Sequence, residues 1–142
     1  AEYVFTIASV GVTAQSEVTQ AVDTLIAKGV DCFSNLTDNN VVGVLGSILE
    51  KTNEAGIPVY GSEIEQMKLG CVAGAGLDYV QLGIQTGKMA AKILPGEATC
   101  QDLPYEVIEN YSLYVNSNAL AQMGITLPDD LAQEAEEVGA TA

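Results

Sequence analysis

Short runs of β-branched residues alternate with longer stretches of helical periodicity along most of this chain, and this alternation constrains the fold more than any other feature. The segment 2–10 is rich in β-branched and aromatic residues, which predicts a strand. From Ser16 the apolar residues recur at helical spacing until Gly29, which predicts a helix that ends at a glycine C′ residue. Strands separated by helices in this way are typical of a parallel α/β sheet.

The same alternation continues towards residue 96 and then changes character. Further strands are predicted at 31–36, 58–61 and 71–76, and further helices from Asn40 to about Gly56 and from Tyr79 to Leu94. The last of these helices carries a stripe that we expect to face the core: Leu82, Met89, Ala90 and Ile93. Residues 105–115 predict one or two strands near an edge or hinge, followed by a helix capped at Asn116 or Ser117 and a helix with Pro128 at its first position. The sequence therefore predicts one α/β domain with a doubly wound, mostly parallel sheet of Rossmann or flavodoxin type.

A short polar cluster follows each of three predicted strands. The clusters are Thr37-Asp38-Asn39-Asn40, Gly61-Ser62-Glu63 and Leu77-Asp78-Tyr79. The carboxyl ends of parallel strands meet at one edge of a sheet, and ligands bind there. The candidate ligand-binding residues are Thr37, Asp38, Asn39, Asn40, Glu63 and Asp78.

Each cluster also has a structural interpretation. Asp38, Asn40 and Asp78 stand at predicted helix starts, where Asp and Asn side chains cap the first N–H groups. Glu63 can equally be an ordinary exposed loop acid. Asp78 beside a cavity could bind an ammonium group directly. Capping and ligand binding therefore both remain open for these residues.

The charge and the missing residue types exclude several classes of function. Nineteen acids against five lysines give a net charge of -14, which repels nucleic acids and anionic membranes. Because there is no histidine and no arginine, the chain has no Ser-His-Asp triad, no histidine zinc site and no guanidinium clamp for phosphate. No Walker sequence or complete dinucleotide fingerprint occurs. We expect no catalytic residue, no metal and no cofactor. The acids from Asp129 to Glu137 are predicted to form one solvated helix face.

The three cysteines are too far apart to suggest a metal site or a disulfide framework. Cys32 and Cys71 fall in strand-like runs and are predicted to be buried as small apolar groups. Cys100 falls in a turn and is predicted to be more exposed. No apolar run reaches the roughly 18 residues that a membrane-spanning helix needs.

Two stretches carry a specific resemblance. Gly56-Ile57-Pro58-Val59-Tyr60-Gly61-Ser62-Glu63 is followed by Gly76-Leu77-Asp78-Tyr79 and by Leu82-Gly83-Ile84-Gln85-Thr86-Gly87-Lys88-Met89-Ala90. Together they closely resemble the substrate-binding proteins of ABC transporters with a type I periplasmic-binding-protein fold. The nearest subgroup looks like the tryptophan/tyrosine-type binding lipoproteins. The resemblance covers nearly the whole chain.

The resemblance implies two Rossmann-like lobes that grip a ligand at a hinge. Residues 1–142 resemble a single lobe, the carboxyl-terminal one, with 105–142 as hinge-proximal strands and closing helices. The implied partners are an amino-terminal lobe, a small-molecule ligand and an ABC permease, and the implied location is periplasmic or extracellular with a lipid anchor. The chain resembles this lobe from the lobe's second strand onward. In a flavodoxin-like order the first strand is central, so a sheet without it would have an unfilled position or an exposed edge. We therefore expect association, strand exchange or rearranged pairing of this chain.

The resemblance also assigns the site. Thr37, Asp38, Asn39, Glu63 and Asp78 match cleft-facing positions of the family, whereas Asn40 departs from the threonine expected there. The resemblance implies that the protein captures a solute for an ABC importer. The implied ligand is an amino acid, which can be an aromatic one, and Asp78 is the implied partner of its ammonium group. Two alternatives stay open: a sensor lobe of the same fold for a sugar or another small ligand, and a flavodoxin-like enzyme lobe. The enzyme lobe would need a phosphate-cradling glycine loop, which the sequence lacks.

Overall fold

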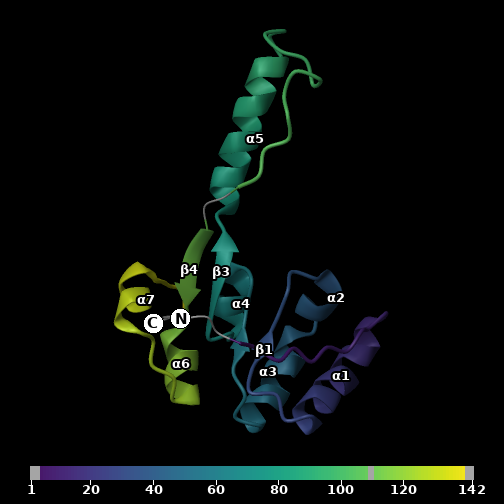
Figure 1. Ribbon diagram of the computed structural model, residues 1–142, viewed down its shortest axis with the longest axis vertical. Helices are drawn as coiled ribbons and strands as arrows, with labels where there is room; N and C mark the ends of the chain where they lie inside the picture. The colour runs from purple at the N-terminus through teal and green to yellow at the C-terminus, as the bar shows by residue number, and fades with distance from the viewer. Residues whose placement is uncertain (1–3, 109–110, 140–142) are drawn as a thin grey trace.

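The computed structural model describes residues 4–108 and 111–139, and shows an α/β body from which one helix and the segment after it extend as an arm (Figure 1). The helices are α1 Gln15–Ala27, α2 Asn39–Val42, α3 Leu45–Glu54, α4 Ile64–Leu69, α5 Tyr79–Ile93, α6 Ser117–Met123 and α7 Asp129–Glu134. The strands are β1 Phe33–Ser34, β2 Val59–Tyr60, β3 Ala73–Leu77, β4 Tyr111–Val115 and β5 Glu136–Glu137. The predicted α/β class is confirmed.

The strands form two sheets, β1-β2 and β3-β4-β5, which a single bridge joins into one continuous layer. β1 and β2 are parallel, with Phe33 opposite Val59. β2 joins β3 through a parallel bridge between Gly61 and Gly74, and the Gly61 N–H donates to the Ala73 carbonyl oxygen at 2.9 Å. β4 is antiparallel to β3, and β5 is parallel to β4. Because β1, β2 and β3 run in the same direction, their carboxyl ends lie along the same edge, as predicted.

Helices cover both faces of this sheet. One apolar cluster joins α1, α3 and α4 to β2, and it includes Val22, Leu49 and Met67. A second cluster joins the start of β3 to α6. Tyr114 belongs to the first cluster and Val115 to the second, and adjacent residues of a strand point to opposite faces. The two clusters therefore lie on opposite faces, which is the doubly wound arrangement.

The joint between β2 and β3 depends on glycine. A Cβ atom added at Gly74 would lie 2.2 Å from the Gly61 carbonyl oxygen and 2.8 Å from the Met67 Cε atom. We expect Gly74→Ala to lower the free energy of unfolding by about 1–3 kcal/mol, because a backbone carbonyl cannot move aside as a flexible side chain can. Urea unfolding followed by circular dichroism measures this change.

Gly83→Ala is the matched control for Gly74→Ala. Gly83 lies within α5, and a Cβ atom there would meet nothing within 4 Å. Alanine is a better helix former than glycine, so this variant should unfold at the same urea concentration as the parent or slightly above it. Equal destabilisation by the two alanines would contradict the close contact at Gly74.

The predicted strand at 2–10 is wrong for the residues that the structure describes. Residues 4–10 belong to no strand, and Val4 and Ile7 are 92% and 87% exposed. Residues 2 and 3 lie outside the described part. A β-rich sequence becomes a strand only where a neighbouring strand accepts its hydrogen bonds. Among the described strands β1 pairs with β2 alone, so segment 4–10 does not use the other edge of β1 as a pairing partner.

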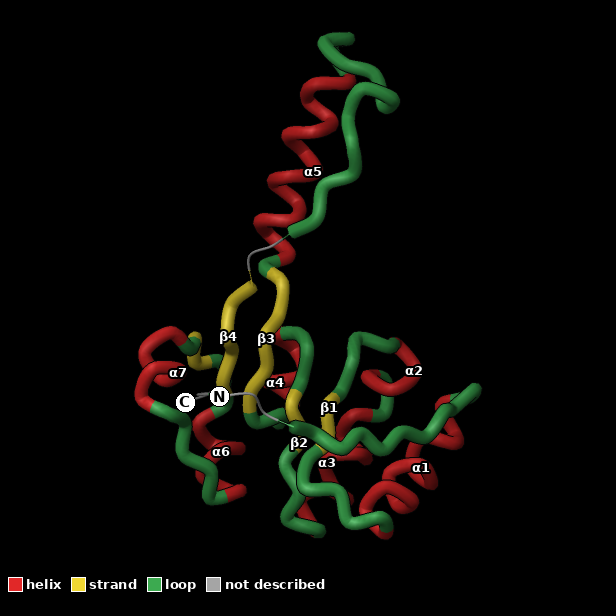
Figure 2. Tube along the Cα trace, viewed as in Figure 1, coloured by secondary structure: helices red, strands yellow, loops and turns green. Residues whose placement is uncertain are grey.

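The core-facing stripe predicted on the third helix is also wrong. No residue of α5 is buried, and Leu82 is among its exposed apolar residues. Figure 2 shows why: β3 carries the chain to the edge of the body, so that α5 begins beyond the other helices and extends away from them. Gly83 and Gly87, expected to give a close approach to the sheet, meet nothing within 4 Å. The stripe exists, but no described part of the body covers it.

Smaller differences concern short elements. The helix predicted from Asn40 is divided into α2 and α3, and Asp38 caps it. Sequence reasoning missed α4, because six residues are too few for a clear helical period. Glu136 and Glu137 form β5 rather than part of a helix, and Pro128 stands one position before α7 begins. Residues 105–108 form no strand.

Other predictions were confirmed or corrected residue by residue. Gly29 follows α1 with φ +74°, and the Asn116 side chain accepts a hydrogen bond from the Ala119 N–H at the start of α6, as predicted. Cys71 is buried and Cys100 is exposed, but Cys32 is exposed because β1 lies at the edge of the sheet. No helix in the described residues is long and apolar enough to cross a membrane.

Candidate functional site

The first two polar clusters meet at the carboxyl ends of β1 and β2. The hydroxyl oxygens of Thr37 and Ser62 lie 2.9 Å apart, a hydrogen-bond distance. Beneath them, the buried Gln66 Oε1 accepts hydrogen bonds from Asn35 Nδ2 at 3.2 Å and from the Ser62 N–H at 3.1 Å. The parallel pairing of the two short strands thus brings together two clusters that are 25 residues apart in the chain.

Asp38 acts as a helix cap at this edge. Its Oδ1 accepts hydrogen bonds from the Asn40 N–H at 2.9 Å and from the Val41 N–H at 3.2 Å. Asn39 and Asn40 are the first two residues of α2, and both are exposed. The capping interpretation is therefore confirmed for Asp38 and wrong for Asn40. A ligand role for the three residues stays a prediction.

Glu63 connects the second cluster to the third. It stands at the N-cap position of α4, where its side chain makes no capping hydrogen bond. A Cβ atom added at Gly76 would lie 3.1 Å from the Glu63 Cα atom, so Glu63 lies beside the end of β3. Burial, together with the smaller effect of the nearby charge of Glu63, raises the pKa of the Cys71 thiol to about 12. Cys71 therefore stays a neutral thiol at physiological pH, while Glu63 keeps its side chain available at the edge.

Asp78 caps the arm helix α5. Its Oδ1 accepts hydrogen bonds from the Val80 N–H at 2.9 Å and from the Gln81 N–H at 3.1 Å. Both of these bonds use Oδ1. The carboxylate can therefore bind a ligand cation through Oδ2 without giving up the cap.

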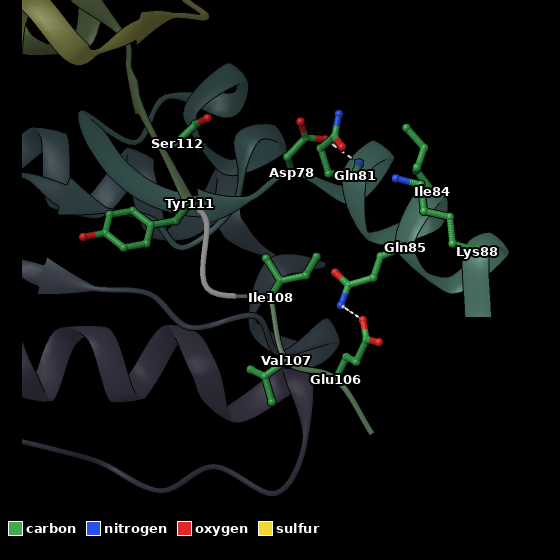
Figure 3. Close-up of a pocket in the computed structure, with 10 residues that line it drawn as sticks. All are labelled: Asp78, Gln81, Ile84, Gln85, Lys88, Glu106, Val107, Ile108, Tyr111 and Ser112. Carbon is green, nitrogen blue, oxygen red and sulfur yellow. Dashed lines mark hydrogen bonds between the residues drawn. The ribbon is translucent and has the colours of Figure 1, made fainter. Parts of the chain in front are cut away.

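Asp78 also lines an open cavity of about 630 Å³ between α5 and the segment that returns to β4 (Figure 3). The walls come from α5 through Gln81, Ile84, Gln85 and Lys88, and from the return through Glu106, Val107, Ile108, Tyr111 and Ser112. Gln85 Nε2 donates to Glu106 Oε2 at 2.6 Å across the two walls. The cavity combines the carboxylates of Asp78 and Glu106, the ammonium group of Lys88 and apolar side chains, a mixture that suits a small zwitterion with an apolar part.

The structure brings the predicted residues together only in part. Asp78 lines this cavity, whereas Thr37, Asp38, Asn39, Asn40 and Glu63 lie along the strand-end edge outside it. Sequence reasoning missed Gln66, because α4 was not predicted. It also missed Lys88 and Tyr111, because these residues line the cavity only where α5 lies opposite the segment that returns to β4. No group of three or more Cys, Asp or Glu side chains in the described residues is placed to hold a metal ion.

This arrangement matches a known family. Residues 3–139 match the family described as ABC transporter substrate binding protein. The chain belongs to this family. The predicted resemblance is thereby confirmed, and the family is one of solute-binding proteins.

Individual members agree with this assignment. The tyrosine-binding protein of Clostridioides difficile strain R20291 is 31% identical over 110 residues, which are 78% of this chain and 31% of that protein. The ABC domain from Streptococcus pneumonia in complex with L-Trp is 26% identical, with a TM-score of 0.77 over 89% of this chain and 42% of that one. The ligand-free, open structure of a substrate-binding protein with adhesive properties from Clostridium difficile is 30% identical, with a TM-score of 0.75 over 96% of this chain and 45% of that one. The chain spans less than half the length of each of these relatives, the share expected of a single lobe.

Proposed function

We propose that this chain is one lobe of the solute-binding component of an ABC importer, and that it captures an amino acid with an aromatic side chain. The observation that carries the proposal is the family match over residues 3–139, with relatives named for binding tyrosine and L-Trp. The ligand lies between this lobe and a second one and stabilises the closed arrangement through its higher affinity for it. A permease then receives the ligand from the closed protein.

The two strands that lead into the arm support a hinge at this position. β3 and β4 pair antiparallel from Ala73 opposite Val115 to Leu77 opposite Tyr111, and β3 leads into the arm that precedes β4 in the sequence. The arm exposes Tyr79, Val80 and Ile84 on its helix and Tyr105 and Val107 on its return segment. Apolar side chains in such number on one element mark a surface that another part of a protein covers. We assign that covering role to the second lobe.

The charges at the site favour a ligand with an ammonium group. Asp38, Glu63 and Asp78 lie at the carboxyl ends of β1, β2 and β3, and the sequence contains no arginine or histidine. Asp78 is our choice for the direct ionic contact, because it lines the cavity and uses only Oδ1 to cap the helix. The ligand carboxylate is then bound by Lys88, by neutral donors such as Thr37 and Ser62, or by the second lobe.

Members of the family act outside the cytoplasmic membrane, in the periplasm or extracellular space. A lipid anchor would hold the two-lobe protein near its permease. Without a second lobe, the exposed arm and segment 4–10 would favour a dimer or strand exchange between two copies of the chain.

A thermal-shift screen of amino acids, sugars, nucleosides, flavins and dinucleotides on the two-lobe protein tests the proposal. A ligand at 100 times its Kd adds about 2.7 kcal/mol to the free energy of unfolding, so tyrosine or tryptophan should raise the Tm by several degrees. Stabilisation by a sugar with no effect of any amino acid would instead favour the sensor lobe of the same fold. Stabilisation by a flavin or dinucleotide would favour the enzyme lobe.

A further inference from the structure

The Gln66 side chain is a buried polar group that joins two strand ends. Gln66 is on α4 and is 0% exposed. Its Oε1 accepts from Asn35 Nδ2, next to the end of β1, and from the Ser62 N–H, next to the end of β2. The Asn35 N–H in turn donates to the Tyr60 carbonyl oxygen at 2.8 Å. One amide oxygen therefore binds both the Ser62 N–H, which follows β2, and the Asn35 side chain, which follows β1.

The surroundings leave this amide little freedom to move. A Cβ atom added at Gly61 would lie 2.9 Å from Gln66 Oε1 and 3.0 Å from the Met67 Sδ atom. Gly61 is thus the residue that lets the amide lie against the chain between the two strand ends. The hydrogen bond between the Thr37 and Ser62 hydroxyl groups lies close to both partners of this amide, since Thr37 is two residues after Asn35 and the Ser62 N–H itself donates to Oε1. A displacement of Oε1 would therefore move the two hydroxyl groups relative to each other.

The other end of the same amide has no partner. Gln66 Nε2 is buried, and within the described residues it makes no hydrogen bond. A buried donor without a partner destabilises a fold, and a methionine of similar size would avoid that cost. A methionine would, however, leave Asn35 Nδ2 and the Ser62 N–H without this acceptor, so the two hydrogen bonds at Oε1 are what the amide contributes here.

We propose that Gln66 is a positioning residue for the ligand site: its amide oxygen sets the separation of the ends of β1 and β2, and so places Thr37, Ser62 and Glu63 against the ligand. This inference rests on the proposed function for its ligand, and on the hydrogen bonds of Gln66 for its geometry. Gln66 itself is fully buried and does not touch the ligand.

The test uses the two-lobe protein with L-tyrosine and L-tryptophan as probes. Gln66→Met keeps the volume and removes the acceptor, and it should weaken binding by about tenfold in calorimetry, equivalent to about 1.4 kcal/mol. Gln66→Glu restores an acceptor oxygen while its buried carboxyl is protonated, and should recover part of that loss below neutral pH. Thr37→Val should be strongly non-additive with Gln66→Met, because both changes disturb the same contact.

Val22→Ala is the control for a purely structural effect, since Val22 is a buried core residue on α1 outside the site. It should lower the Tm with a less than about twofold change in Kd. If Gln66→Met binds like the parent, or if its effect simply adds to that of Thr37→Val, Gln66 is not a positioning residue, although the proposed function stands.

A second measurement needs no ligand. Hydrogen exchange of the Ser62 amide should be much faster in Gln66→Met than in the parent, while the Ile48 amide on α3 keeps its rate relative to global stability. If the parent binds no amino acid at all, the proposed function fails, and the Ser62 exchange rate still decides the role of Gln66. Unchanged protection of Ser62 would overturn that role.

Discussion

Asp78→Asn should weaken binding of the amino-acid ligand by more than about 30-fold while it leaves the Tm of the free two-lobe protein almost unchanged. Removing one partner of a desolvated charge pair costs about 2–5 kcal/mol of binding free energy. Asparagine caps helices as well as aspartate does, so the hydrogen bonds from Val80 and Gln81 to the capping oxygen survive. Isothermal titration calorimetry and a thermal melt of the same sample measure the two effects.

Asp78→Ala separates the two roles of this side chain. It removes the charge and the cap together, so it should match the affinity loss of Asp78→Asn and in addition lower stability by about 1 kcal/mol. Asp129→Asn is the control for a general change of net charge, because Asp129 is an exposed residue on α7. It should leave the affinity within about twofold. Asp78 would be only a helix cap if Asp78→Asn bound the ligand normally.

Local patterns in the sequence were enough to predict the body of the fold. Val18 and Val22 are buried on α1, and Leu45, Ile48 and Leu49 on α3, because a helical period in apolar residues depends only on near neighbours in the chain. The parallel order of β1, β2 and β3 follows from the helices between them, and this order places the polar clusters on one edge. The strand ends therefore predicted the edge where the polar clusters gather, but not the cavity beside α5, of whose lining residues only Asp78 was a predicted site residue.

The failures concern residues whose environment is set by distant parts of a protein. Segment 4–10 has the composition of a strand but pairs into no strand, and the stripe on α5 has the pattern of a core face but none of its residues is buried. The apolar pattern of a segment predicts that its surface is covered, but it does not predict which part of the protein covers it. Gln66 was missed for a related reason, since its contacts to Asn35 and Ser62 exist only once α4 has folded under both strands.

The arm helix should be the least protected helix of the chain when residues 1–142 are studied alone. None of its 15 residues is buried, and an isolated helix of this length is only marginally stable in water. Gly83 and Gly87 weaken it further, by about 1 kcal/mol each relative to alanine. Amides of α5 should therefore exchange with deuterium at least about a thousandfold faster than those of α4 and β3, which open only with the body.

Adding the second lobe should reverse this behaviour. If the lobe covers the stripe of Leu82, Met89 and Ile93, exchange of the α5 amides should slow towards the rate set by global unfolding. Leu82→Ala should then cost the two-lobe protein about 2 kcal/mol or more, but change the stability of residues 1–142 by no more than about 0.5 kcal/mol. Leu49→Ala, in the buried core, is the matched control and should destabilise both proteins by about 2–5 kcal/mol.

The concentration dependence of hydrogen exchange in α5 distinguishes whether a second copy of the chain or the second lobe covers the arm. Protection of α5 that rises with the concentration of residues 1–142 would show that a second copy covers it, as the expected dimer or strand exchange requires. Strong protection in a dilute monomer, confirmed by light scattering, would contradict the exposed arm itself. Rapid exchange of the α5 amides in residues 1–142 alone, together with slow exchange only when the second lobe is present, would show that the second lobe covers α5.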